Sequence, residues 1–276
     1  MTYSTLMACL RPGETNAGLL AVAGDLAQRF DASVVGLATR QPMQYLFSGA
    51  LVPEALIEQE KAGFQAQSDA LETEFREALK ARARDLEWRA KMTLGPLSDT
   101  VADEARCADL VITQYGPGGA FSHPATHLDV GDLLMRVGRP VLVAPPGAER
   151  LTLGHVVVGW KETLESRRAV SDALPLLKAA GGVTIASVGG QPQLAGTRSC
   201  IDDVVAWLSR HGVAADTVVA ESLGDEARAL TQIAQDRGAE LIVAGAFGQS
   251  RLREWVFGGV TRDLLMHSER FTLLSH

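Results

Sequence analysis

The run Asp132-Leu133-Leu134-Met135 recurs 131 positions later as Asp263-Leu264-Leu265-Met266. Around these two runs, residues 100–143 align without a gap on residues 231–274. Outside the runs, identical residues stand at equivalent positions, among them Arg106 and Arg237, Leu110 and Leu241, and Leu142 and Leu273. A repeat of this length predicts that the chain consists of two halves with one architecture.

The two halves differ in length. Near their starts, residues 6–10 correspond to residues 156–160 at an offset of 150, so the first half carries about 19 extra residues in its middle. Pro145-Pro146-Gly147 is the expected junction, which predicts one domain over 1–147 and a second over 148–276. The extra length falls at 53–84, where a stretch rich in Glu, Ala, Gln and Lys predicts one long amphipathic helix.

Short runs rich in Val, Ile and Leu alternate with helical patterns in both halves. In the second half, strands are expected at 155–160, 182–188, 217–221, 240–245 and 271–274, and helices at 163–179, 199–211, 225–237 and 259–267. In the first half, strands are expected near 5–10, 32–38, 87–93, 109–113 and 140–144. This alternation predicts an α/β fold, with a doubly wound parallel sheet in each domain.

Composition excludes several classes of protein. The 276 residues carry 26 Lys and Arg against 33 Asp and Glu, a net charge of −7, and neither half has the basic excess that nucleic-acid binding usually needs. No apolar window approaches the roughly 18 residues of a spanning helix, so no membrane partner is expected and a cytoplasmic location is. The three cysteines are far apart and lack CxxC spacing, so no metal site is expected.

Glycines follow the strand expected at 240–245 and recur before the last helix. In open parallel sheets, ligands bind beyond the carboxyl ends of the strands, where backbone N–H groups and helix N-termini are available. Two elements nine residues apart would embrace a polyphosphate here, formed by Gly245, Gly248, Gly258, Gly259, Val260 and Thr261. Glycine also closes strands for structural reasons, so the spacing alone leaves both interpretations open.

This pattern of GxxG, nine residues, and a glycine before a small residue and Val-Thr resembles the nucleotide-binding signature of the universal stress protein family. The segment 249–257, the strand at 155–160 with the helix start at 166–169, and the closing strand at 271–274 also resemble the family. Because the first half repeats the plan, the resemblance covers nearly the whole chain. It points to a tandem member built from two adenine-nucleotide α-hydrolase-like domains.

The resemblance implies a site for ATP or AMP in the second half, with Mg²⁺ as a companion ion. Carried over by position, the six residues named above would hold the phosphates and ribose, Val188 would meet the adenine, and Trp160, Lys161 and Glu162 would line the base and ribose side. Two positions depart from the family pattern. Lys161 stands where binding members usually have an acidic residue, and Gly259 where Ser or Thr is common.

The first half lacks the key glycines at the equivalent positions. Gln114 stands in place of Gly245, and Pro117, His127 and Leu128 replace the next three, while Arg11 corresponds to Lys161. We therefore expect the first half to bind no nucleotide and to serve structure, pairing or partner contact.

Three functions remain open from the sequence. The first is a tandem universal stress protein, a cytoplasmic stress-response or regulatory module with one adenine-nucleotide site and at most slow ATP hydrolysis. The second is a nucleotide-free protein-interaction module of the same fold. The third, a nucleotidyl-transfer enzyme, lacks the catalytic His or Lys motif expected in its phosphate loop. The resemblance also implies that the two halves pair with each other, and it leaves open a homodimer of chains.

Overall fold

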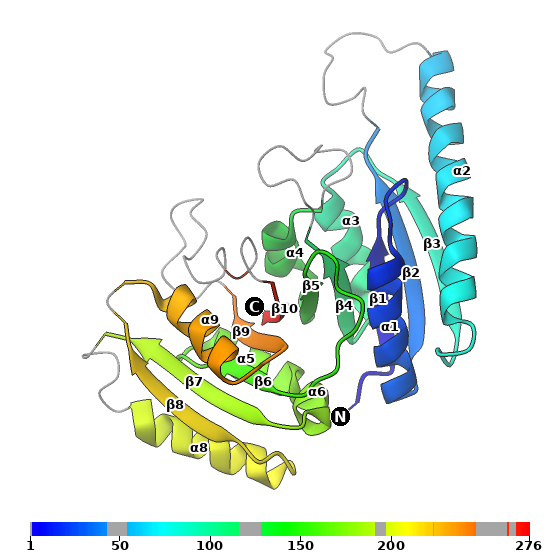
Figure 1. Cartoon of the computed structure of the whole chain (residues 1–276). Coiled ribbons are helices and arrows are strands. Elements are labelled where there is room, and N and C mark those ends of the chain that lie inside the picture. Colours follow the sequence, from blue (N-terminus) through cyan, green and yellow to red (C-terminus); the bar gives the residue numbers. More distant parts are fainter. Residues whose placement is uncertain are drawn as a thin grey trace. The chain divides into compact units, whose positions relative to one another are not determined.

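The computed structural model describes residues 2–42, 54–115, 128–190, 197–222, 224–246, 264 and 269–276 (Figure 1). Contacts divide the chain into two compact units. One contains residues 2–138 and 146–150, and the other contains residues 139–145 and 151–276. We call them the N-unit and the C-unit.

The N-unit is built on a four-stranded parallel sheet in the order β3-β2-β1-β4. Its strands are β1 (Thr5–Leu10), β2 (Ser33–Arg40), β3 (Leu86–Met92) and β4 (Leu110–Gln114). Its helices are α1 (Ala17–Phe30), α2 (Glu54–Leu79), α3 (Leu97–Glu104), the short 3-10 helix η2 (Ala105–Cys107) and α4 (Val130–Val137). The central strands β1 and β4 are buried almost throughout, as expected of strands covered on both faces.

The C-unit has the strand order β5-β10-β9-β6-β7-β8. The neighbours within β10-β9-β6-β7-β8 are parallel, and β5 pairs antiparallel with β10. The strands are β5 (Val141–Ala144), β6 (Val156–Gly159), β7 (Val183–Gly189), β8 (Asp216–Glu221), β9 (Leu241–Gly245) and β10 (Phe271–Ser275), and the helices are α5 (Leu164–Asp172), α6 (Leu174–Ala179), α8 (Thr197–Arg210) and α9 (Glu226–Asp236). Both units therefore confirm the predicted doubly wound α/β fold.

The prediction of a single helix at 163–179 is wrong, because the structure has two helices there, α5 and α6. Pro175 is the physical reason. Proline has no N–H to donate to the carbonyl four residues earlier, and its ring clashes with that turn, so it is accommodated only near a helix start. Here it lies in the first turn of α6, and both short helices still pack their apolar sides inward.

The long helix predicted at 53–84 is present as α2, which runs along β3 and β2 (Figure 1). Its buried residues recur every three or four positions and form one stripe: Phe64, Ser68, Leu71, Phe75 and Leu79. The helix ends at Leu79, and the chain then turns toward β3, with the Arg84 N–H bonded to the Ala32 carbonyl at 3.0 Å. α2 is thus docked on its own sheet, and it exposes a charged outer side.

The strand β5 comes from the first half of the sequence and belongs to the C-unit by its contacts. It pairs antiparallel with β10, with Val143 opposite Thr272 and Val141 opposite Leu274. The next residues, Pro146–Arg150, belong to the N-unit. Because the two units interleave at this point, the domain limits 1–147 and 148–276 stay a prediction.

We expect stability to rise with pH between about 5 and 7, in part through His155. Its Nε2 lies 2.9 Å from Thr184 Oγ1, just before β6. Burial and the nearby Arg237 lower the pKa of His155 below 6.5, although Asp216 opposes them. The unfolded chain then binds more protons near pH 6, so this contribution is present above the unfolded pKa and is lost as pH falls through the folded pKa. Urea denaturation at several pH values would measure how the free energy of unfolding changes with pH. This change should be smaller for His155→Asn than for the wild type, and an equal change would contradict the assignment.

Candidate functional site at the carboxyl ends of the strands

In the C-unit, the crossing point of the fold lies between β6 and β9. The chain moves outward from β6 through β7 to β8, and then returns to place β9 on the other side of β6. The crevice of a doubly wound sheet opens where the strand order reverses in this way, beyond the carboxyl ends of the two strands. The residues concerned are Gly159, which ends β6, with Trp160 after it, and Gly245, which ends β9, with Ala246 after it.

Gly245, one of the predicted phosphate-binding residues, has a packing role in the structure. A Cβ at this position would lie 2.6 Å from the backbone carbon of Glu165 and 2.6 Å from the backbone nitrogen of Ser166. Only glycine allows the first turn of α5 to approach the end of β9 this closely. Thr163 caps that turn by accepting a hydrogen bond from the Ser166 N–H at 3.3 Å. The N-terminus of α5 therefore borders the end of β9.

Lys161 extends from the end of β6 toward the first turn of α9, where its Nζ forms an ion pair with Glu226. The lysine side chain is 51% exposed and that of Glu226 is 23% exposed. The acidic group that the family pattern places at position 161 is thus replaced by a lysine beside a carboxylate from another helix. Sequence reasoning did not identify Glu226; the capping residue Asp225 before it was the only local signal.

Trp160 and Lys161 lie on opposite faces of the sheet, because successive side chains of a strand alternate. Trp160 is 5% exposed and lines a pocket with residues of α5 and α8. Val188 is buried near the end of β7. Continuing the β6–β7 register from Gly159 and Ala186 places Val188 opposite Lys161, on the face of α9. The predicted base-side residues are therefore divided between two faces.

The other predicted site residues lie outside the described residues. These are Gly248, Gly258, Gly259, Val260 and Thr261, together with the helix expected at 259–267 apart from Leu264. Their proposed role as a phosphate cradle stays a prediction.

Comparisons with known proteins find matches to the whole fold and to part of the sequence. Residues 201–274 match the model of the universal stress protein family. A universal stress protein from Archaeoglobus fulgidus DSM 4304 has the same fold, at 12% identity and a TM-score of 0.78, over 98% of this chain and 95% of its own. A protein of unknown function from Pseudomonas aeruginosa PAO1 follows at 15% identity and a TM-score of 0.68, over 99% and 92%. No curated protein matches the sequence.

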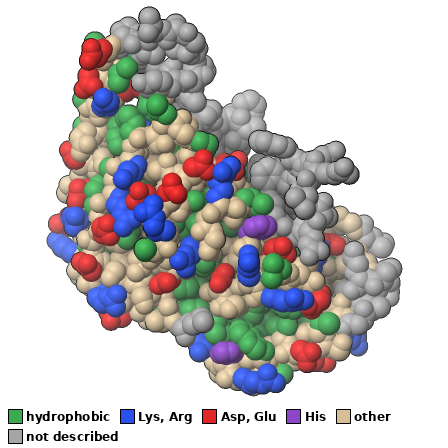
Figure 2. Space-filling model, turned by 180° about the vertical axis from the view of Figure 1, so that it is seen from behind, with side chains coloured by type: hydrophobic (Ala, Val, Ile, Leu, Met, Phe, Trp, Pro, Cys, Tyr) green, Lys and Arg blue, Asp and Glu red, His purple; other side chains and the backbone are tan. Residues whose placement is uncertain are grey.

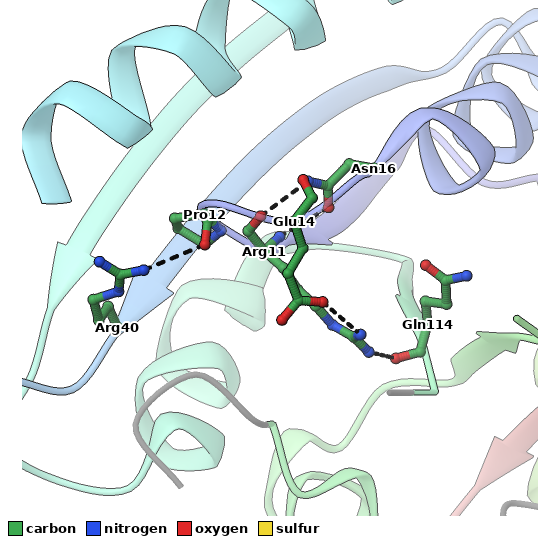
Figure 3. Close-up of polar contacts among 6 residues, drawn as sticks. All are labelled: Arg11, Pro12, Glu14, Asn16, Arg40 and Gln114. Atoms are coloured by element: carbon green, nitrogen blue, oxygen red, sulfur yellow. Dashed lines mark hydrogen bonds and ion pairs between the residues drawn. The ribbon is translucent and has the colours of Figure 1, made fainter. Parts of the chain in front are cut away.

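The universal stress protein fold thus extends over both halves. In the N-unit, Arg11 is the residue that corresponds to Lys161. Figure 3 shows that Arg11, after β1, points toward the end of β4, where its Nη2 donates to the Gln114 carbonyl. Its Nη1 pairs with Glu14 at 3.2 Å. Arg40, at the end of β2, donates from Nη2 to the Pro12 carbonyl at 3.3 Å. Side chains of the N-unit therefore tie together the ends of its own strands.

The two halves share one further polar contact after the first strand. In the N-unit, the Arg11 N–H donates to Asn16 Oδ1 at 2.9 Å. In the C-unit, the Lys161 N–H donates to Ser166 Oγ at 3.3 Å, again five residues on. The two halves thus share a hydrogen bond from the backbone N–H of this loop to a side-chain oxygen five residues later. The cationic side chains differ, since Arg11 is only 16% exposed and Lys161 remains 51% exposed.

Among the described residues, no group of three or more His, Cys, Asp or Glu could hold a metal ion. No helix in the described part of the chain is both long and apolar enough to cross a membrane. Lys, Arg, Asp and Glu are interspersed over the described part of the face in Figure 2.

Proposed function

We propose that this universal stress protein is a regulatory module that binds one adenine nucleotide, ATP or AMP, in its C-terminal half. The observation that carries the proposal is the contrast between Lys161 and Arg11. Arg11 is largely buried and holds the Gln114 carbonyl, so it occupies the end of its own sheet. Lys161 is half exposed at the crossing point of the C-unit, where a phosphate can compete with Glu226 for it.

The chemistry of these groups fits a nucleotide. Lys161 supplies a cation for a phosphate, and Glu226 supplies carboxylate oxygens suited to a ribose hydroxyl or to the water shell of Mg²⁺. The N-terminus of α5 adds the favourable end of a helix dipole at the end of β9. We assign the site a binding role and no catalytic step. The stress-response role and the cytoplasmic location remain parts of this proposal.

Calorimetric titration with ATP and with AMP, in the presence of Mg²⁺, should give one equivalent per chain. Lys161→Gln should weaken binding by about 10-fold or more, because a hydrogen bond to a charged group contributes roughly 1.5–3 kcal/mol. Arg11→Gln is the matched control, and it should leave both affinity and stoichiometry unchanged. Two equivalents per chain would contradict the prediction that the N-unit binds no nucleotide.

The alternative is a nucleotide-free interaction module, favoured by the ion pair that already neutralises Lys161. Absence of saturable binding of either nucleotide would favour this alternative over the first.

In both cases, we propose that the halves pair through their last strands, supported by the antiparallel ladder between β5 and β10. A homodimer of chains would be detected by analytical ultracentrifugation.

A further inference from the structure

A pocket of about 400 Å³ lies between α5 and α8, on the sheet face opposite to α9. Figure 1 shows α8 and α9 on opposite sides of β7 and β8. The walls of the pocket are largely apolar and consist of Trp160, Val170, Cys200, Val204 and Trp207. The volume is within the range of small-molecule sites, which are roughly 300–1,000 Å³. It contains neither of the charged groups that the proposed nucleotide site uses, Lys161 and Glu226.

Two indole rings distinguish this pocket from an ordinary packing gap. Trp160 comes from the end of β6 and Trp207 from α8. The Nε1 of Trp160 is buried and has no hydrogen-bond partner among the described residues. A buried tryptophan N–H usually finds an acceptor, and leaving a buried donor unpaired is unfavourable. Trp160, a residue of the pocket wall, therefore carries a donor without an acceptor in the part of the chain that the structure describes.

The rim of the pocket is acidic overall. Glu162 and Arg167 form an ion pair there, with side chains 51% and 57% exposed. Asp203 adds a second carboxylate without a second cation among the lining residues. Two carboxylates and one guanidinium disfavour a phosphorylated or carboxylated ligand by like-charge repulsion. The electrostatics therefore favour an uncharged occupant.

We propose that the pocket is a second ligand site, for a small, neutral, planar ring compound with one hydrogen-bond acceptor. Its ring would stack against the indoles of Trp160 and Trp207, which gain from aromatic contact beyond the area they bury. Its acceptor would supply the partner that Trp160 Nε1 does not find among the described residues. The site lies beside the proposed nucleotide site and is chemically distinct from it.

The test uses 1-indanone, a neutral ring ketone, and indane, the same skeleton without the acceptor. In protein labelled with ¹⁵N at the tryptophan indoles, 1-indanone should shift the resonances of Trp160 and Trp207 saturably. Indane should bind more weakly, on the order of 2- to 10-fold, which corresponds to the loss of one neutral hydrogen bond. Trp160→Phe retains a ring and removes the N–H, so it should abolish the difference between the two probes.

Val204→Phe should fill the pocket and weaken 1-indanone binding at least 10-fold. Val205→Phe is the matched control, because it adds the same bulk to the next residue of α8, which does not line the pocket. Indole spectra of both variants would show that they fold. Three results would overturn the proposal: no saturable shift, equal weakening by the two phenylalanine variants, or displacement of 1-indanone by ATP. The last would assign the pocket to the nucleotide base.

Discussion

Replacing Phe75 by alanine should lower the free energy of unfolding by about 3–5 kcal/mol, the usual cost of truncating a fully buried phenylalanine. Phe75 is inaccessible to solvent, and its ring centroid lies 5.4 Å from that of Trp88 on β3. Gly36 on β2 leaves room for both rings, since a Cβ there would lie 2.9 Å from Phe75 and 2.7 Å from Trp88. The contact therefore joins α2 to two strands.

Urea denaturation followed by circular dichroism would measure this change, and hydrogen exchange would show whether α2 loses protection. Glu74→Ala, on the exposed side of the same helix, is the control and should change stability by less than about 0.5 kcal/mol. If Phe75→Ala were equally mild, α2 would be a detachable arm.

Gly245→Val should lower the free energy of unfolding on the order of 3 kcal/mol, at the upper end of typical overpacking costs. The new Cβ would meet the backbone of Glu165 and Ser166 at 2.6 Å. Backbone cannot rotate away as a flexible side chain can, so α5 must move as a whole or tilt away from β9. The higher strand propensity of valine offsets only part of this cost.

Thermal and urea unfolding of nucleotide-free protein would test this packing role separately from ligand binding. Gly63→Ala in α2 is a suitable control, because no atom lies within 4 Å of the added Cβ. It should stabilise the protein by about 0.5–1 kcal/mol, since glycine is a poor helix former. Unchanged stability of Gly245→Val together with lost ATP binding would instead show that Gly245 acts only on phosphate.

The fold could be predicted from the sequence because its strands are short, apolar and separated by amphipathic helices. The run 241–245 illustrates this, since a strand buried on both faces needs an unbroken apolar stretch. The break between α5 and α6 was missed although Pro175 is visible in the sequence, because the apolar periodicity continues through it. The antiparallel pairing of β5 with β10 depends on contacts between distant segments, which no local pattern encodes.

The candidate site was less predictable for the same reason. Gly245 was recognised as special, but its spacing alone did not reveal the approach of α5, about 80 residues earlier in the chain. The ion pair between Lys161 and Glu226 joins residues 65 positions apart. The alternation that turns Trp160 away from Lys161 was available in principle, because a strand end at Gly159 fixes which face each following residue takes.

The place of β5 has a practical consequence for dividing the chain. A fragment that starts at residue 148 would lack β5 and would leave β10, whose residues Phe271–Ser275 are all buried, as an unpaired sheet edge. Exposed apolar edges of this kind recruit other strands and promote aggregation. A fragment that begins at Arg139 retains this covering strand, so we expect it to aggregate less than the fragment that starts at residue 148.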